Sequence, residues 1–185
     1  MKRVLLGLGS NKSFNNKSPL ELLACAGEEL SCLMQDCFFS SVYTTPAMYV
    51  TDQENFYNAA VSGYVADDTD PFDFLHKINE IEAKYGRDRA KEIRFGPRSL
   101  DIDIELFGEE RINAPDLQIP HVRMEERAFV LIPSIEVLKD SADELIREKY
   151  IKCLSAVEKT GGADGIKKIQ SFPKAVENGR NSESS

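Results

Sequence analysis

Long apolar runs are missing from this sequence. None approaches the roughly 20 residues that are needed to span a bilayer, and the opening segment, residues 1–12, turns polar too soon for a secretion signal. These absences argue against an integral membrane protein and against secretion. We therefore expect a cytoplasmic protein that has no membrane partner.

Zinc-binding residues are also scarce. The four cysteines, at positions 25, 32, 37 and 153, form no C-x-x-C pair, and His76 and His121 are the only histidines. Structural zinc sites draw closely spaced ligands from these two residue types. The sequence thus argues against a zinc site, and its cysteine pattern fits a reducing compartment.

Positive charge is in deficit, with 23 Lys and Arg against 31 Asp and Glu and a formal net charge of −8. Nucleic acid is not an expected partner, because general nucleic-acid binding needs a broad basic surface. Any bound anion has to be held by a local group of basic residues. The remaining composition, 42% hydrophobic and 29% charged over 185 residues, is typical of a globular protein of about one domain.

Helix starts are the clearest local signals. Residues 18–21, Ser-Pro-Leu-Glu, combine a capping hydroxyl, a proline at the first helical position and a glutamate three residues after the cap. They predict a helix that runs to about residue 35. Asp70 and Pro71 repeat this chemistry before a helical apolar face that ends at Gly86. Strand-like segments lie at residues 3–8, 38–45, 56–65 and 100–107.

The order of these elements, β-α-β-β-α-β, predicts an α+β fold of the ferredoxin-like type. In that fold, an antiparallel sheet carries two helices on one face. We expect residues 1–160 to form a single domain, with C-terminal additions after the last of these strands. Residues 161–185 contain much Gly, Asn and Ser and few apolar side chains, which predicts a flexible C-terminal tail.

The predicted strand at 100–107 carries an alternating acidic pattern. Asp101, Asp103 and Glu105 share one face, while the intervening residues, Leu100, Ile102, Ile104 and Leu106, are expected in the core. Two same-face neighbours start about 6.6 Å apart at their Cα atoms. Two such carboxylates suit Mg²⁺, which takes oxygen ligands and completes its shell with phosphates. A solvated polar strand face is an equally good interpretation of this pattern alone.

A basic segment precedes the acidic strand. Residues 84–98 hold six basic residues against two acidic ones, in a chain that is acidic overall. Arginine binds phosphate with a planar pair of donors. A cation-binding carboxylate pair next to clustered arginines therefore favours a metal-complexed polyphosphate as ligand. A solubilising loop is the alternative, but it does not explain one sign of charge beside the acidic strand.

Two further residues carry ambiguous signals. Glu82 falls within the apolar stripe of its predicted helix, where an unpaired carboxylate is costly. It should pair with an arginine or face a pocket, unless the helix is rotated outward. His121 follows Pro120 and either donates to a phosphate or caps local backbone groups. Elsewhere Phe129 and residues 45–48 offer apolar walls, and the amide of Asn58 suits the edge of a heterocycle.

Residues 94–104 read Arg-Phe-Gly-Pro-Arg-Ser-Leu-Asp-Ile-Asp-Ile and match the signature R-x-G-P-R-x-x-D-[LI]-D-I of a known family. Further matching stretches follow the family's order, at residues 7–11, 41–46, 56–61, 81–82, 86–87 and 120–121. The chain from about Val4 to Val137 thus resembles the 6-hydroxymethyl-7,8-dihydropterin pyrophosphokinases of folate biosynthesis.

The resemblance implies a ferredoxin-like α+β enzyme that transfers the β,γ-diphosphate of its co-substrate ATP to the hydroxymethyl group of a reduced pterin. Asp101 and Asp103 would bind two Mg²⁺ ions, and Asp103 would help to deprotonate the attacking hydroxyl. The catalytic residues implied are Asp103, Arg87 and Arg98. The ATP site implied comprises Asn79, Glu82, Arg94, Arg98, Ile104, Leu117, His121 and Arg127. The pterin pocket implied comprises Thr45, Pro46, Met48, Phe56, Asn58, Phe95 and Phe129, with Phe56 and Phe129 stacking on the two ring faces.

Some positions depart from the family's pattern, and two other functions stay open. Phe95 stands where the family often has tryptophan, and Val122 cannot donate a hydrogen bond. One alternative is a catalytically silent relative that binds nucleotide or pterin as a regulatory module; an intact carboxylate pair argues against it. Another is a different two-metal phosphotransferase, such as a nucleotidyl transferase, which would be expected to lack Thr45 and Asn58. Whether the chain has protein partners is not readable from the sequence.

Overall fold

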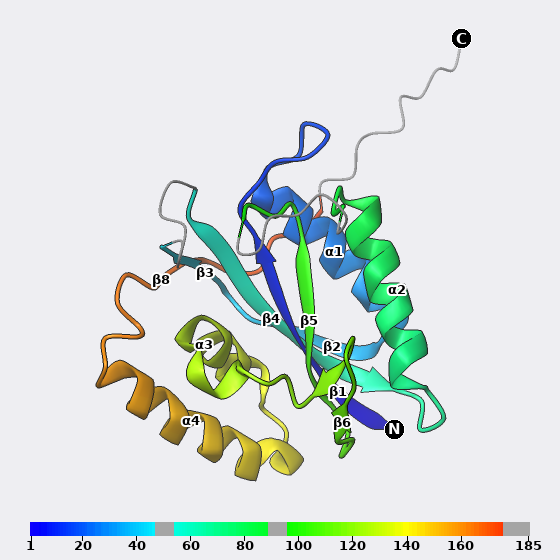
Figure 1. The fold of residues 1–185 in the computed structure, drawn as a ribbon, viewed down its shortest axis with the longest axis vertical. Coiled ribbons are helices and arrows are strands. Elements are labelled where there is room, and N and C mark those ends of the chain that lie inside the picture. Colours follow the sequence, from blue (N-terminus) through cyan, green and yellow to red (C-terminus); the bar gives the residue numbers. More distant parts are fainter. Residues whose placement is uncertain (47–53, 89–95, 176–185) are drawn as a thin grey trace.

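A six-stranded antiparallel sheet forms the centre of the computed structural model, which describes residues 1–46, 54–88 and 96–175 (Figure 1). Its path runs β5-β1-β4-β3-β8, and β2 also pairs with β4. The strands are β1 (Lys2–Ser10), β2 (Gln35–Phe39), β3 (Val42–Thr45), β4 (Phe56–Val65), β5 (Asp101–Phe107) and β8 (Lys167–Gln170). A separate small ribbon joins β6 (Ile112–Asn113) to β7 (Gln118–Ile119). The predicted α+β class with an antiparallel sheet is therefore confirmed.

Both predicted helix starts are confirmed by their caps. Helix α1 (Pro19–Leu33) begins after Ser18, whose hydroxyl accepts from the Glu21 amide while the Glu21 carboxylate accepts from the Ser18 amide. Helix α2 (Pro71–Lys84) begins after Asp70, whose carboxylate accepts from two amides of the first turn. Each cap satisfies backbone donors that have no partner inside the helix.

The single strand predicted at 38–45 is two strands, β2 and β3, both paired with β4. Ser40 and Ser41 separate them, because the Ser40 hydroxyl and the Glu136 carboxylate make hydrogen bonds here in place of main-chain strand partners. The Ser40 hydroxyl accepts from the Ala60 amide at 2.8 Å, and the Ser41 amide donates to Glu136 at 2.9 Å. The break lets the chain change direction along one partner strand.

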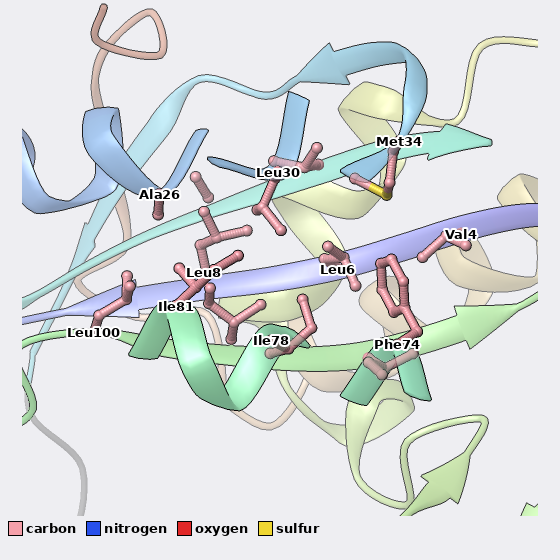
Figure 2. Packing of buried hydrophobic residues seen from close by; sticks show 14 of the residues in the cluster. Val4, Leu6, Leu8, Ala26, Leu30, Met34, Phe74, Ile78, Ile81 and Leu100 are labelled. Carbon is pink, nitrogen blue, oxygen red and sulfur yellow. The ribbon is translucent and has the colours of Figure 1, made fainter. Parts of the chain in front are cut away.

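One face of the sheet packs against α1 and α2. Figure 2 shows Leu6 and Leu8 of β1 between Ala26 and Leu30 of α1 on one side and Ile78 of α2 on the other. These side chains are fully or almost fully buried. The prediction that both of these helices cover one face is confirmed, and removal of this apolar area from water is a main stabilising term of the fold.

The opposite face is covered by later helices. Helix α3 (Ala128–Val137) lies on this face and α4 (Glu144–Glu158) packs against α3, with Leu5, Leu106 and Tyr150 in the shared cluster (Figure 1). Short 3-10 turns, η1 (Met124–Glu126) and η2 (Ser141–Asp143), precede them. No helix in the described ranges has the length and apolarity that crossing a membrane requires.

A bulge in β5 interrupts the strict alternation of side chains that the sequence predicts for this strand. Leu5 pairs with Leu106 but Leu6 pairs with Ile104, so Glu105 is an extra residue in the ladder. The expected burial of Leu106 holds, but it packs in the cluster around Leu5 rather than with Ile104. A bulge places two successive residues against one partner and changes the direction of side chains beyond it.

The C-terminal segment differs from the flexible tail predicted for 161–185. Residues 167–170 form β8, which pairs with β3, and the ring of Phe172 lies 4.6 Å from that of Phe39 between centroids. Gly27 of α1 makes room for it, because a Cβ there would lie 2.6 Å from the Phe172 ring. The Phe172 contact and the pairing of β8 with β3 thus hold residues 167–172, whose composition had suggested irregular structure. Residues 176–185 lie outside the described ranges.

Phe172→Ala should lower the free energy of unfolding by roughly 1–3 kcal/mol, because a partly buried ring loses its contacts with Phe39 and α1. Hydrogen exchange should quicken in β8 and in the paired residues of β3. Urea unfolding and exchange measurements check this, with Phe38→Ala, an exposed aromatic of β2, as the control. Equal unfolding free energies for Phe172→Ala and the wild type would contradict the anchoring role.

Candidate active site

A cavity of about 290 Å³ opens on the sheet face that carries α3. Strands β1, β4 and β5, the end of β3, and the start of α3 contribute its walls. The lining residues are Gly7, Leu8, Gly9, Thr45, Pro46, Phe56, Asn58, Ala59, Gly96, Arg98, Asp101, Asp103, Glu105, His121, Arg127, Phe129 and Val130. Charged groups of β5 and aromatic groups of β4 and α3 therefore meet in one space.

Two glycines of β1 keep the floor of this cavity open. Gly7 pairs with Asp103, and Gly9 pairs with Asp101. A Cβ on Gly7 would lie 2.9 Å from the Glu105 carboxylate, which is closer than real contacts allow. A side chain at this position would displace the Glu105 carboxylate, so the glycine leaves room for it.

The acid pair has two different environments. Arg87 and Arg98 both form ion pairs with the Asp101 carboxylate, whereas Asp103 has no hydrogen bond or ion pair to any described residue. Burial, together with the charges of Asp101 and Glu82, raises the pKa of Asp103 to about 7. A nearby cation would favour its ionised form.

Oxygen donors at this spacing fit Mg²⁺, which commonly binds one or two carboxylates and takes its other ligands from phosphates and water. Within the described part of the chain, no group of three or more His, Cys, Asp or Glu could hold a metal ion. A magnesium ion here would therefore depend on ligands from a substrate.

Glu82 links α2 to the acid strand. Its side chain is 1% exposed, and its Oε1 accepts from the Ile102 amide at 2.8 Å and from Arg87. The prediction that Glu82 pairs with an arginine is confirmed. Since Arg87 also contacts Asp101, Glu82 holds this guanidinium against the acid pair.

Arg98 is held by its backbone. Its amide donates to the side-chain oxygen of Asn11 at 2.8 Å, and its carbonyl accepts from the amides of Asn11 and Lys12. Arg87 and Arg98 also line a second hollow of about 700 Å³ next to the first. The two arginines therefore lie where a charged chain longer than the first cavity could continue.

His121 lies at the far end of the acidic strand. Its amide donates to the Glu105 carbonyl at 3.1 Å, and its ring is 23% exposed. Burial and the charge of Arg127 lower the pKa of His121. Burial and the charge of Asp103 raise the pKa of Glu105 well above its usual value. The guanidinium of Arg127 lies 5.6 Å from the centroid of the Phe129 ring.

The other side of the cavity is aromatic and amide-lined. Phe56 and Phe129 face it together with Pro46. The Asn58 amide donates to the Thr45 hydroxyl at 2.9 Å, and both residues are buried. A buried amide that lines the cavity suits a flat polar heterocycle.

Some sequence-predicted residues do not reach the cavity. Ile104 and Leu117 belong to the hydrophobic core, and half-buried Asn79 of α2 lines neither described hollow. Met48, Arg94 and Phe95 lie outside the described residues. Glu105 and Gly7 are lining residues to which the sequence reasoning gave no role. The sequence signal for Glu105 was its place as the third acid in the alternating series after Asp101 and Asp103.

A model of the 7,8-dihydro-6-hydroxymethylpterin-pyrophosphokinase family matches residues 5–139. The chain belongs to this family. A pyrophosphokinase of this pterin from Pseudomonas aeruginosa is 36% identical over 144 residues, which cover 76% of this chain and 83% of the relative. A Bacillus subtilis enzyme of the same name is 41% identical over 105 residues, covering 57% of this chain and 60% of the relative.

Longer relatives share the family region. A mitochondrial folate synthesis bifunctional protein of Arabidopsis thaliana is 38% identical over 143 residues, covering 76% of this chain but 24% of the plant protein. The crystal structure of Plasmodium falciparum HPPK-DHPS matches with a TM-score of 0.61 at 16% identity, over 91% of this chain and 48% of that one. At this identity the structural match supports the fold alone. The chain spans about a quarter of the first plant relative and about half of the Plasmodium chain.

Asp103→Asn should stabilise the magnesium-free protein more at about pH 8 than at about pH 5. The pKa of Asp103 is raised to about 7 in the folded state, so folding favours its protonated form and the acid's contribution to stability falls as pH rises through that value. Asparagine has no such proton to lose. Melting temperatures at the two pH values check this, with exposed Asp68→Asn as the control. An equal change in melting temperature at both pH values would contradict the raised pKa of Asp103.

Proposed function

We propose that the protein transfers the β,γ-diphosphate of ATP to the hydroxymethyl group of 6-hydroxymethyl-7,8-dihydropterin and releases AMP. One observation carries the proposal. The same cavity combines an acid pair beside arginines with a heterocycle site of two aromatic rings and a buried amide. Family membership and the names of its bacterial relatives support the same activity.

The proposed phosphate end comprises Asp101, Asp103, Arg87, Arg98, His121 and Arg127. The two carboxylates would hold two magnesium ions, which neutralise charge on the triphosphate when they are bound. Arg87 and Arg98 now supply positive charge to Asp101, and a cation bound there would take over that role. Their guanidinium groups would then be available to phosphate oxygens, for which their planar donors are suited.

The transfer step depends on positioning and charge stabilisation more than on covalent help. Asp103 is the proposed acceptor of the hydroxyl proton, since burial brings its pKa to about 7. Glu82 holds Arg87 in place through the contacts described above. The proposed ATP roles of Asn79, Arg94, Ile104 and Leu117 rest on the resemblance alone.

The proposed pterin end comprises Phe56 and Phe129, which stack on the ring faces, and Asn58 and Thr45, which bond to the ring edge. Flat heterocycles favour such aromatic faces, and Pro46 adds an apolar wall. Met48 and Phe95 are assigned here by resemblance.

The proposal also covers the fold type and the bounds of the catalytic domain. A ferredoxin-like arrangement is supported by the path from β5 through β1 and β4 to β2 and β3, with α1 and α2 on one face. Residues 1–160 are proposed to act as a single catalytic domain. Helix α4 supports this extent because it packs with α3 in the second hydrophobic cluster.

Incubation with MgATP and 6-hydroxymethyl-7,8-dihydropterin should yield AMP and the pterin diphosphate, because the reaction moves two phosphoryl groups together. Chromatography with mass detection identifies both products. ADP or inorganic diphosphate as the product would contradict the proposal. Binding of both substrates without turnover would instead favour the silent relative.

Asp101→Ala and Asp103→Ala should each reduce kcat by at least about a hundredfold, because each removes charge that positions the triphosphate. Circular dichroism should show an intact fold, since neither side chain belongs to the hydrophobic core. Asp68→Ala, an exposed acid in the turn after β4, serves as the matched control. Near-normal kcat in either site variant would refute the metal assignment.

Asn58→Ala should raise KM for the pterin by about tenfold or more and change KM for ATP little, because a buried amide that reads the ring edge is lost. Steady-state kinetics with each substrate varied in turn checks this. An increase confined to ATP would place Asn58 at the nucleotide instead.

A further inference from the structure

Glu105 is a buried acid that the proposed reaction does not use. Its side chain is 1% exposed, and it enters the cavity because the bulge in β5 and the missing side chain at Gly7 make room for it. A buried carboxyl group is costly without a partner. We therefore expect the Glu105 carboxyl group to have a hydrogen-bond partner.

The available partner is His121. Among the described residues, Glu105 Oε2 and His121 Nδ1 are both buried atoms without a hydrogen-bond partner. They lie 3.7 Å apart, and the His121 amide already donates to the Glu105 carbonyl. A small side-chain rotation closes the remaining gap to hydrogen-bond length, and catalytic hydrogen bonds are often long in ligand-free sites.

No other described cation competes for this oxygen at close range. Arg127 lines the same cavity and acts on Glu105 electrostatically, but the two form no ion pair within the described ranges. Asp103, the neighbouring acid, repels Glu105. Within the described ranges, the imidazole is the basic group that lies within 4 Å of Oε2.

We infer that Glu105 is a positioning residue that holds the His121 ring through a hydrogen bond between Oε2 and Nδ1, so that Nε2 faces the polyphosphate. One proton between the two atoms suffices, whichever atom carries it. A ring fixed from behind in this way meets a phosphate without losing rotational freedom on binding. The inference rests on the proposed function for its effect on ATP but not for the contact itself.

Glu105→Leu should raise KM for ATP by about tenfold or more, with KM for the pterin unchanged. The melting temperature should not fall, because Glu105→Leu also removes the repulsion between Glu105 and Asp103, so the loss would not come from unfolding. Glu105→Gln, which keeps an oxygen and a nitrogen able to bond Nδ1, should restore most of the affinity. The double variant Glu105→Leu with His121→Ala should match His121→Ala alone.

The contact has a readout that does not depend on activity. Proton NMR of the wild type should show one strongly deshielded, slowly exchanging proton from the pair. It should vanish in Glu105→Leu and His121→Ala and persist in His76→Gln, the control at the exposed second histidine.

The outcomes separate the two claims. Unchanged KM for ATP in Glu105→Leu, additive losses in the double variant, or absence of the NMR signal from the wild type would each overturn the role of Glu105. A wild type that shows the signal but makes no AMP would overturn the proposed function while leaving the contact in place.

Discussion

The pairing of β1 with β5 is the constraint on which the site depends. Glycines on β1 stand opposite the acids on β5, so one strand supplies charge and its neighbour supplies space. Hydrogen bonds between the strands hold this register, and a shift by one residue would turn every side chain to the other face. Leu6 and Leu8, which alternate with the glycines, anchor the register in the core.

Concentrated negative charge is the cost of this arrangement. Asp101, Asp103, Glu105 and Glu82 lie near one another, and burial makes their repulsion stronger. The protein offsets it with Arg87 and Arg98, each fixed by bonds outside the acid pair. The acids and the arginines are therefore in fixed positions before any ligand binds. Fixed polar groups of this kind stabilise charge as it develops in a reaction.

Local signals in the sequence were the reliable ones. Ser18 and Asp70 mark helix starts through contacts within three residues, and the acid alternation needs only the strand's own periodicity. Glu82 was predictable because one carboxylate on an apolar helix face has to find a partner. The bulge at Glu105 was not predictable, since it arises from how β5 matches β1 almost a hundred residues away. The core position of Leu117 and the pairing of β8 with β3 depend on similarly distant contacts.

Strand β8 has a consequence for solubility. The outer edge of β3 would otherwise present unpaired amides and carbonyls, and such an edge is a template for joining another molecule. Residues 167–170 occupy it from within the same chain, beyond the region that the family model matches. A protein shortened before this strand would carry an open sheet edge beside Thr45, where self-association and substrate entry would compete for the same end of the sheet.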